Sequence, residues 1–541
     1  MTADPLAFFS LDHGTASTAA ALIAPLAGRF RLLGSAAQPA GRSVEPLLEG
    51  IVADVVAADG DALPAWRGWA DWTRLETATR PPLRAVVAAG SDRRLAALEV
   101  AVAGGGWRIV GRISPDRTDA LEATGLCLAQ DLDLVIIGAG EQPQPEERRP
   151  VADLAALIAA VSARRRGLRV LLAGAAADEA ERFAPDAVVL GPAVTAAPSA
   201  VPTPLRTLCA RLAGPLGDDG PPGKPRLPDG RACFVTAIRS LAGLLERRVE
   251  GVDVGMAASQ RILATTEGLR GQLCLADAAL VPEAAVSDDR QTDAIAAWST
   301  LRADASQLRD DVRNVRLRPW AGAAGEGAHL RLAAARAALE RLDAAWRLGL
   351  EPDGRAPSYH SDLLVASGGA FAVAPPPAVA LALVDTLRRS GAMTMVLDHA
   401  RILAPLGALE AEDDRHRMLA DLLDDALLPL GSAIIASGLR AGRRAGTLRI
   451  ASGGATSEVP VVPGDIEVVD LPPGLTATAE LDVRDGAWLG MRARRITVEV
   501  GGGLGGLLVD TRDIPLRLPE RSERRRDLLE SWQGPLWGAD E

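Results

Sequence analysis

The stretch "FFSLDHGTAST" at residues 8–18 decides how this chain is read. Its apolar run ends in Asp12, and Gly14, Thr15 and Ser17 follow. Gly14 lets the backbone approach a bound group closely, while amides and hydroxyls at Thr15 and Ser17 can donate to phosphate oxygens. Asp12 would face Mg2+ through water, because this ion keeps most of its water shell. The stretch is therefore either a phosphate-binding turn or a plain hairpin between two strands.

A second turn of the same kind lies in "VEGVDVGMAASQ" at residues 249–260. An apolar strand again ends in an acid, Asp253, followed by Gly255 and the small residue Ser259. Taken alone, this stretch also fits an ordinary hairpin. Its value lies in repeating the pattern of the first turn.

A third element, "DLLVASGGAFAVAPP" at residues 362–376, runs from an apolar strand into Ser367, Gly368 and Gly369. Paired glycines there would let adenosine and its α-phosphate lie against the backbone, near the start of a helix. The glycine clusters at 449–458 and 498–510 are followed by further strands, so they are interpreted as β-turns.

Composition narrows the function classes. A chain of 541 residues suggests about three or four domains. The net charge of −11 argues against a nucleic-acid partner. No two cysteines form a CxxC pair, which argues against a zinc site or a disulfide framework. The opening residues lack a basic signal region and no apolar run is long enough to cross a bilayer, so a cytoplasmic protein without membrane contact is expected.

The order of patterns along the chain predicts several domains. A β-meander at 6–38 and a helix are followed, at 84–213, by apolar strands alternating with helices, which is typical of a doubly covered parallel sheet. After 440, short strands separated by Gly and Pro favour a small β-sandwich or barrel, closed by a helix. The predicted domains are a first lobe at 1–80, an inserted α/β domain at 81–213, a linker at 214–230, a second lobe at 231–435 and a β-rich domain at 436–541.

The order of the three elements is similar to that of the actin, hexokinase and heat-shock chaperone (ASKHA) ATPase superfamily, whose two lobes each supply a phosphate hairpin. Residues 6–410 resemble more closely one branch, the glutamate mutase L (GlmL/MutL) family. The resemblance rests on "LDHGTASTAAALI", "TDALEATGLCLAQDLDLVIIGAG", "EGVDVGMAASQRILATTEG" and "DLLVASGGAFAVAPPPAVALALVDTL", and on the following "MTMVLDHARILAPLGAL". It implies a two-lobed actin-like ATPase (ribonuclease-H-like) α/β fold with an inserted Rossmann-like α/β domain and a β-rich C-terminal domain.

The resemblance also implies a function and a site. ATP with Mg2+ would bind between the lobes, and lobe closure would remodel a protein client, for which the family suggests an adenosylcobalamin-dependent mutase. Asp12 and Asp253 would arrange the attacking water, with Asp12 also facing the metal. The residues implied in nucleotide binding are Gly14, Thr15, Ser17, Gly255, Ser259, Ser367, Gly368 and Gly369.

Several positions depart from the family pattern. Ala19 stands where the first loop usually ends in a lysine or similar polar residue, and Met256, Ala258 and Gln260 replace a glycine, a threonine and an acid. These changes predict nucleotide binding with weak hydrolysis at most. The alternatives are a scaffold or assembly protein without ATPase activity, and a sugar or small-molecule kinase of the same fold. The cobalamin signature DxHxxG is absent from 84–213, so direct cobalamin binding is not expected. The oligomeric state stays open.

Overall fold

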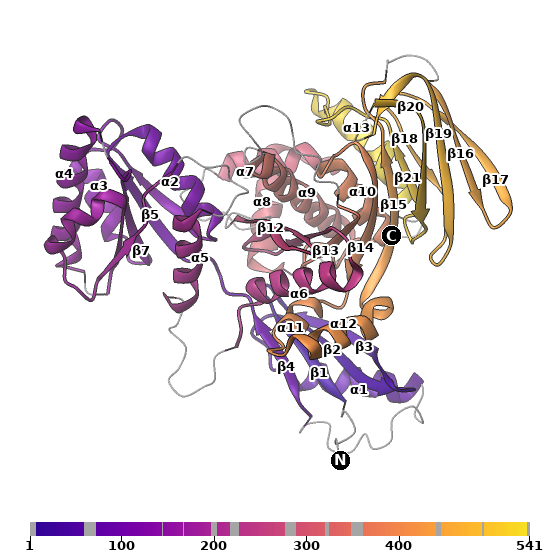
Figure 1. Ribbon diagram of the computed structural model, residues 1–541, viewed down its shortest axis with the longest axis horizontal. Helices are drawn as coiled ribbons and strands as arrows, with labels where there is room; N and C mark the ends of the chain where they lie inside the picture. The colour runs from indigo at the N-terminus through magenta and orange to yellow at the C-terminus, as the bar shows by residue number, and fades with distance from the viewer. Residues whose placement is uncertain are drawn as a thin grey trace.

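The computed structural model describes residues 7–58, 72–142, 144–165, 167–195, 203–216, 227–275, 288–319, 324–347, 361–439, 445–489 and 492–537. Figure 1 shows their arrangement: the first lobe lies at the bottom, the second lobe in the centre, the inserted domain at the left and a C-terminal sheet at the upper right. The layout places the two lobes in direct contact and the other two parts on their flanks.

The first lobe is a four-stranded sheet of order β3-β2-β1-β4. Its elements are β1 (Phe8–His13), β2 (Ser17–Leu26), β3 (Arg29–Pro39), α1 (Glu45–Ala58) and β4 (Arg74–Ala78). The predicted β-meander is confirmed, and β2 and β3 are joined by Ala27 and Gly28, both with positive φ, as a two-residue hairpin requires. β4 runs parallel to β1, so the two strands end at the same edge.

The second lobe repeats this order and extends it. Its sheet begins β12-β11-β10-β13-β14, with β11 antiparallel to both neighbours and β13 parallel to β10. The strands are β10 (Val249–Val254), β11 (Ser259–Thr265), β12 (Gly268–Leu275), β13 (Leu363–Ser367), β14 (Gly391–Asp398) and β15 (Leu427–Ile435). The duplicated order of hairpin, third strand and parallel fourth strand confirms the two-lobed, actin-like α/β fold.

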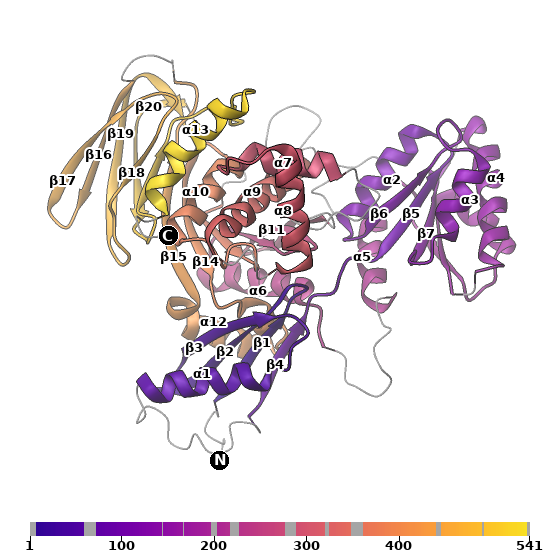
Figure 2. The same ribbon diagram turned by 180° about the vertical axis from the view of Figure 1, so that it is seen from behind.

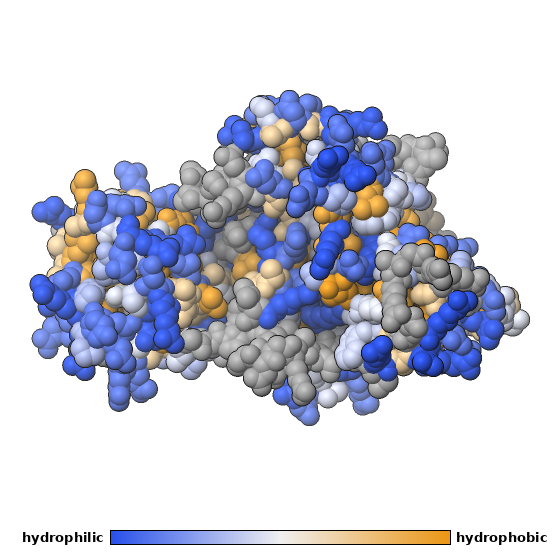
Figure 3. All heavy atoms as spheres, turned by 90° about the horizontal axis from the view of Figure 1, so that it is seen from above, coloured by the Kyte–Doolittle hydropathy of each residue, from blue (hydrophilic) through white to orange (hydrophobic). Residues whose placement is uncertain are grey.

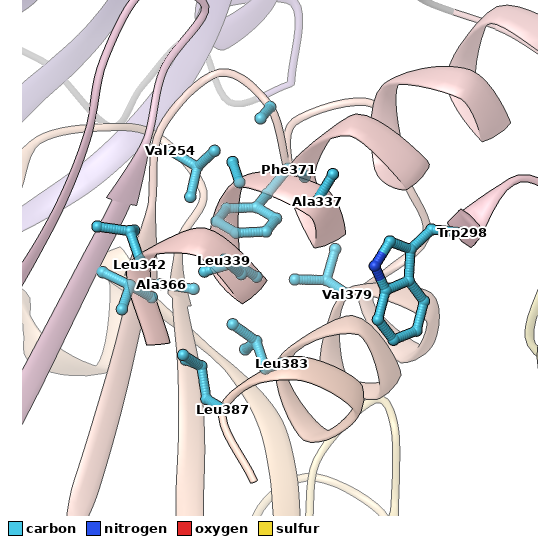
Figure 4. Close-up of a cluster of buried hydrophobic side chains, with 14 of the residues drawn as sticks. Val254, Trp298, Ala337, Leu339, Leu342, Ala366, Phe371, Val379, Leu383 and Leu387 are labelled. Atoms are coloured by element: carbon cyan, nitrogen blue, oxygen red, sulfur yellow. The ribbon is translucent and has the colours of Figure 1, made fainter. Parts of the chain in front are cut away.

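Helices cover both faces of the second sheet. One face packs on α7 (Asp288–Trp298), α8 (Ala305–Leu317), α9 (Gly325–Arg347) and α10 (Pro376–Thr386). Figure 4 shows part of this core, with side chains from α7, α9 and α10. The other face packs on α6 (Gly230–Leu245), α11 (Leu403–Gly407) and α12 (Glu412–Ala426). In this second core, Phe8 and Ile23 of the first lobe join Phe234 and Leu406. The two lobes therefore share one buried apolar cluster.

The inserted domain contains a parallel sheet of order β6-β5-β7-β8-β9 with helices around it, which confirms the predicted alternation of strands and helices. Its elements are β5 (Arg84–Ala89), α2 (Asp92–Gly104), β6 (Arg108–Ile113), α3 (Ala120–Leu128), β7 (Leu134–Gly138), α4 (Pro145–Ser162), β8 (Arg169–Ala173), a 3-10 segment (Gly174–Arg182), β9 (Val188–Gly191) and α5 (Pro204–Leu216).

The inserted domain is tied to both lobes. The chain leaves the first lobe after β4 and returns beside it, where the Ala78 amide donates to the Pro228 carbonyl at 3.0 Å. At the other end, Gly105 forms a parallel β-bridge with Cys274 of β12 in the second lobe. Of the predicted linker at 214–230, residues 217–226 lie outside the described part of the chain.

The C-terminal strands do not form the separate sandwich or barrel that the sequence predicts. β16 (Gly446–Ser452), β17 (Ala455–Val461), β19 (Thr476–Trp488) and β20 (Arg492–Gly501) form a sheet of order β17-β16-β19-β20, whereas β21 (Leu507–Asp510) and β18 (Ile466–Val469) extend the sheet of the second lobe. The β21 end of the second-lobe sheet packs face to face on the sheet of β16, β17, β19 and β20, so the sandwich is shared with the second lobe. The turn at 502–506 allows this pairing: the Gly505 amide donates to Leu430 of β15, and a Cβ at Gly503 would lie 2.2 Å from a backbone nitrogen.

The predicted closing helix is α13 (Ser522–Gln533), which lies along the back of the second lobe in Figure 2. Its end is fixed by Gln533, which accepts a hydrogen bond from Arg336, and by Trp537 stacked on His329. The face in Figure 3 is mostly hydrophilic, with hydrophobic residues in small separate patches. Among the described helices, none combines the length and apolarity needed to span a membrane.

Candidate functional site

The two acid–glycine turns are closed by equivalent backbone hydrogen bonds. In the first, the Gly14 amide donates to the Ser17 carbonyl at 2.9 Å, and in the second the Gly255 amide donates to the Ala258 carbonyl at 2.9 Å. A Cβ at Gly14 would lie only 2.9 Å from the Ser17 carbonyl oxygen, so the tight turn requires glycine there. The match makes Ala258 the structural counterpart of Ser17, which means that the second turn lacks this hydroxyl.

Strand register places the two acids at equivalent points. Asp12 at the end of β1 lies opposite Thr77 of β4, and Asp253 at the end of β10 lies opposite Ser367 of β13. In each lobe the acid therefore sits at the carboxyl edge of two parallel strands. Such edges are where ligands bind in open α/β sheets.

All ten residues that the sequence singles out line one cleft between the lobes. They are Asp12, Gly14, Thr15, Ser17, Asp253, Gly255, Ser259, Ser367, Gly368 and Gly369. Thr79, Arg80, Gly230, Arg231 and Arg401 also line it. Its free volume is about 60 Å3, enough for a few water molecules. Three segments far apart in the chain thus meet at one point, while the chemical roles of these residues stay predictions.

The glycine pair after β13 forms the wall of this cleft. Gly368 has φ +105°, and a Cβ on it would lie 2.4 Å from the Val254 carbonyl oxygen and 2.6 Å from Asp253 Oδ1. A Cβ on Gly369 would lie 3.5 Å from Ser17 Oγ of the first lobe. Gly368 is therefore needed for contact with the second turn, and Gly369 keeps a narrow space open toward the first.

Burial dominates the electrostatics of the two acids. It raises the pKa of Asp12, although the Arg401 guanidinium opposes this shift. Burial, and then the negative charge of Asp12, raises the pKa of Asp253 to about 6, against the effect of a hydrogen bond from Gln260. A cleft that holds two such carboxylates favours a proton or a cation between them.

Arg401 is the main site residue that sequence reasoning missed. It follows β14, its Nη1 donates to Ser17 Oγ at 2.9 Å, and its Nε lies 3.6 Å from Asp12 Oδ2. The residue lies in "LDHARILAPLG", but nothing in that pattern marks an arginine as facing a turn at the start of the chain. Only the fold brings the two segments together.

Asp398, at the end of β14, was missed as well. Its buried carboxylate accepts hydrogen bonds from Ser367 Oγ at 3.0 Å and from the Ile402 and Leu403 amides at 3.0 and 3.3 Å. Burial raises its pKa to about 7. These bonds fix the Ser367 hydroxyl at the cleft and the backbone that follows Arg401.

The arrangement does not fit the Mg2+ expected at Asp12. Asp12 Oδ1 is 3.5 Å from the Thr77 hydroxyl and its Oδ2 faces Arg401, while Asp253 Oδ2 accepts from Gln260 at 3.1 Å. Within the described ranges, no group of three or more His, Cys, Asp or Glu is placed to hold a metal ion. Mg2+ usually binds through one or two carboxylates, with water and phosphate as its other ligands, and here Arg401 and Thr77 already compete for both oxygens of Asp12.

Comparison with known proteins adds little. No protein-family model and no curated protein matches the sequence. Among solved structures, nucleotide-free acetone carboxylase aligns at 12% identity over 84% of this chain and 80% of that chain, with a TM-score of 0.26. The PilM–PilN type IV pilus biogenesis complex aligns at 13% identity over 76% and 95%, with a TM-score of 0.23. Component A of (R)-2-hydroxyglutaryl-CoA dehydratase from Acidaminococcus fermentans aligns at 9% identity over 76% and 99%, with a TM-score of 0.26. TM-scores this low carry no argument, so the fold is assigned from the duplicated sheets.

The carboxyl ends of the parallel strands in the inserted domain form a second edge of the kind at which α/β proteins bind ligands. Side chains fill it. A Cβ at Gly140 would lie 2.8 Å from the Arg94 guanidinium, and one at Gly90 would lie 2.9 Å from the Glu147 carbonyl oxygen. Arg94 also donates to the Val194 carbonyl at 2.8 Å. The cleft between the lobes is therefore the stronger candidate site.

Proposed function

We propose that this protein binds ATP in the cleft between its lobes and uses binding to change how it engages a partner protein. One observation carries the proposal: two turns, each closed by the same backbone hydrogen bond, face one cleft whose wall is the Gly368–Gly369 segment. Backbone amides in tight glycine turns are good donors to phosphate. Two lobes that grip one ligand can shift between arrangements when the ligand prefers one of them.

Each turn has a proposed role. Gly14, Thr15 and Ser17 would donate to one side of the phosphate chain, and Gly255 and Ser259 to the other. Ser367, Gly368 and Gly369 would adjoin the adenosine and α-phosphate. Asp12 and Asp253 would orient water for hydrolysis. The Met256, Ala258 and Gln260 departures favour hydrolysis that is weak at most.

Mg2+ was expected with the nucleotide, at Asp12. Both oxygens of Asp12 already face Thr77 and Arg401. We therefore propose binding of ATP, and the tests below compare binding with and without Mg2+.

The proposed partner is a protein. By the sequence resemblance it would be a cobalamin-dependent mutase, and the inserted domain and C-terminal sheet would provide the contact surfaces. A ligand that prefers one lobe arrangement by about 1.4–2.8 kcal/mol shifts its population about 10- to 100-fold. Pull-down from native cells with and without ATP, followed by identification of the captured proteins, tests this part. Capture that ignores nucleotide would contradict the coupling.

ATP at about 100 times its dissociation constant should stabilise the protein by about 2.7 kcal/mol, visible as a higher melting temperature. Gly369→Val should abolish that increase, because its added carbons enter the space beside Ser17 while its Cβ makes only ordinary contacts at 3.5 Å. The matched control is Gly501→Val, at a glycine with nothing within 4 Å in the C-terminal sheet. Retention of the full increase in Gly369→Val would place ATP elsewhere.

A nucleotide-free scaffold is the second candidate, and one observation favours it: Arg401 occupies the space that Gly14 and Gly369 border, where phosphate would lie. For this function, ATP at millimolar concentration should leave the melting temperature unchanged. An increase without phosphate release would instead identify a protein that binds ATP but does not hydrolyse it.

ATP binding should also depend on pH through Asp253. Its pKa is raised to about 6, so lowering the pH from about 8 to about 6 protonates about half of this carboxyl, reduces the negative charge facing phosphate and tightens binding. Asp12, Arg401, Arg231 and Gln260 are the other groups that act on this carboxyl. Titration calorimetry across this range measures the effect. Asp253→Asn should show a flatter profile, and since the phosphates of ATP titrate alike in both proteins, equal profiles would refute this role.

A further inference from the structure

We propose that Arg401 binds the ligand's phosphate directly at this site, without a divalent metal. The inference rests on the proposed function, and it specifies how the cleft recognises its ligand. It concerns the chemical class of the ligand, a nucleoside polyphosphate, and the residue that neutralises it.

Arg401 already contacts the turn that would hold phosphate. Its Nη1 donates to Ser17 Oγ at 2.9 Å, and its Nη2 lies 3.5 Å from the Ser17 carbonyl oxygen. Arg401 belongs to the loop between β14 and α11, whereas Ser17 begins β2 of the first lobe. The guanidinium therefore reaches across the cleft to the hydroxyl predicted to donate to phosphate.

The same guanidinium lies between the first turn and the glycine pair of the third element. A Cβ at Gly14 and a Cβ at Gly369 would each lie 3.5 Å from Arg401 Nη1. Both glycines thus border the space that the arginine head occupies. A phosphate held by the first turn and the glycine wall would meet this head within hydrogen-bond reach.

The negative charges in the cleft explain why a cation is needed to bind a polyphosphate there. Two carboxylates, Asp12 and Asp253, line the cleft and would repel a polyphosphate. A metal ion usually relieves such repulsion, but the Asp12 carboxylate faces Arg401 instead, with Nε at 3.6 Å from Oδ2. Guanidinium presents five donors in a planar fork that suits phosphate oxygens. Arg231, the neighbouring cation, is turned toward Asp229 and Cys274.

The backbone at Arg401 is held in an unusual conformation. Its φ is 55°, in the left-handed region that few residues other than glycine adopt. Such a conformation persists when the surroundings fix it, and this is common at functional sites. Here Asp398 accepts hydrogen bonds from the two amides that follow, and the Arg401 side chain is only 8% exposed. The arginine is built into the cleft and is not a surface side chain folded over it.

Titration calorimetry with ATP, in excess EDTA and in excess Mg2+, tests the inference. The wild type should bind with similar affinity in both. Arg401→Gln should weaken binding in EDTA by about 10- to 100-fold, the loss expected for hydrogen bonds to a charged group. Arg401→Lys should recover part of it. Arg449→Gln, on the exposed C-terminal sheet, is the matched control and should bind as the wild type does.

The outcomes separate the two proposals. Wild-type binding in Mg2+ but not in EDTA would overturn this inference and leave the proposed function standing. Undiminished binding by Arg401→Gln in EDTA would also overturn it. No binding of ATP in either condition would refute the proposed function and this inference together. Because the wild-type comparison alone decides the metal question, the test holds even if Arg401→Gln fails to fold.

Discussion

Asp510→Asn should lower the free energy of unfolding by about 3–5 kcal/mol, the usual loss when one partner of a buried ion pair is removed. Asp510 is fully buried at the end of β21. Its Oδ1 accepts from Arg388 Nη2 at 3.0 Å and Arg512 Nε at 3.0 Å, and its Oδ2 accepts from Arg512 Nη2 at 2.7 Å. Asparagine would leave two buried guanidinium groups short of negative charge.

The loss should spread beyond this pair. Arg512 also bridges to Asp385, which in turn holds Arg336 under α13. Urea unfolding measures the effect. Asp482→Asn removes an exposed partner of Arg495 in the C-terminal sheet and serves as control, with an expected change of about 0.5 kcal/mol or less. Similar losses in both variants would show that the buried network contributes no more than a surface pair.

Gly368→Ala should lower the free energy of unfolding by roughly 3–5 kcal/mol and abolish ATP binding. At φ +105° an alanine is strained, and its Cβ would lie 2.4 Å from the Val254 carbonyl oxygen, which is held by a hydrogen bond from the Ala370 amide at 3.1 Å. Something in the second turn must therefore move. Unfolding in urea and calorimetry with ATP measure the two effects.

Gly28→Ala is the matched control for this substitution. Gly28 also has positive φ, +81°, but a Cβ there meets nothing within 4 Å. It should cost only the conformational strain, about 1–2 kcal/mol. Equal losses at the two glycines would mean that close approach of the third element to the second turn is unimportant for stability.

Much of the fold could be predicted because its signals are local. The alternation of apolar strands with helices in 84–213 predicted the parallel inserted sheet, and the β-meander at 6–38 predicted the hairpins of the first lobe. The repeated acid–glycine pattern pointed to two equivalent turns, and their hydrogen bonds are indeed the same. Each of these features is determined by a pattern of residues that are close together in the sequence.

What could not be predicted depends on contacts between distant segments. Arg401 and Ser17 are separated by 384 positions, and no local pattern in either stretch refers to the other. The pairing of β21 with β15 depends on the close approach of the turn at 502–506, whose glycines were interpreted only as a β-turn. The competition of Arg401 with Mg2+ for Asp12 could not be predicted for the same reason, since this arginine belongs to the other lobe.

The attachment of the inserted domain has a mechanical consequence. Its two chain ends are joined beside β4, where the Thr79 amide also donates to His13 within the first turn at 2.8 Å, and its α2 end is bridged to β12 of the second lobe. The inserted domain is thus attached to both halves of the molecule. Any rotation of one half against the other must tilt the inserted domain or break the bridge between Gly105 and Cys274. Fluorescent labels on the inserted domain and on α12 would therefore report the rotation as a change in energy transfer.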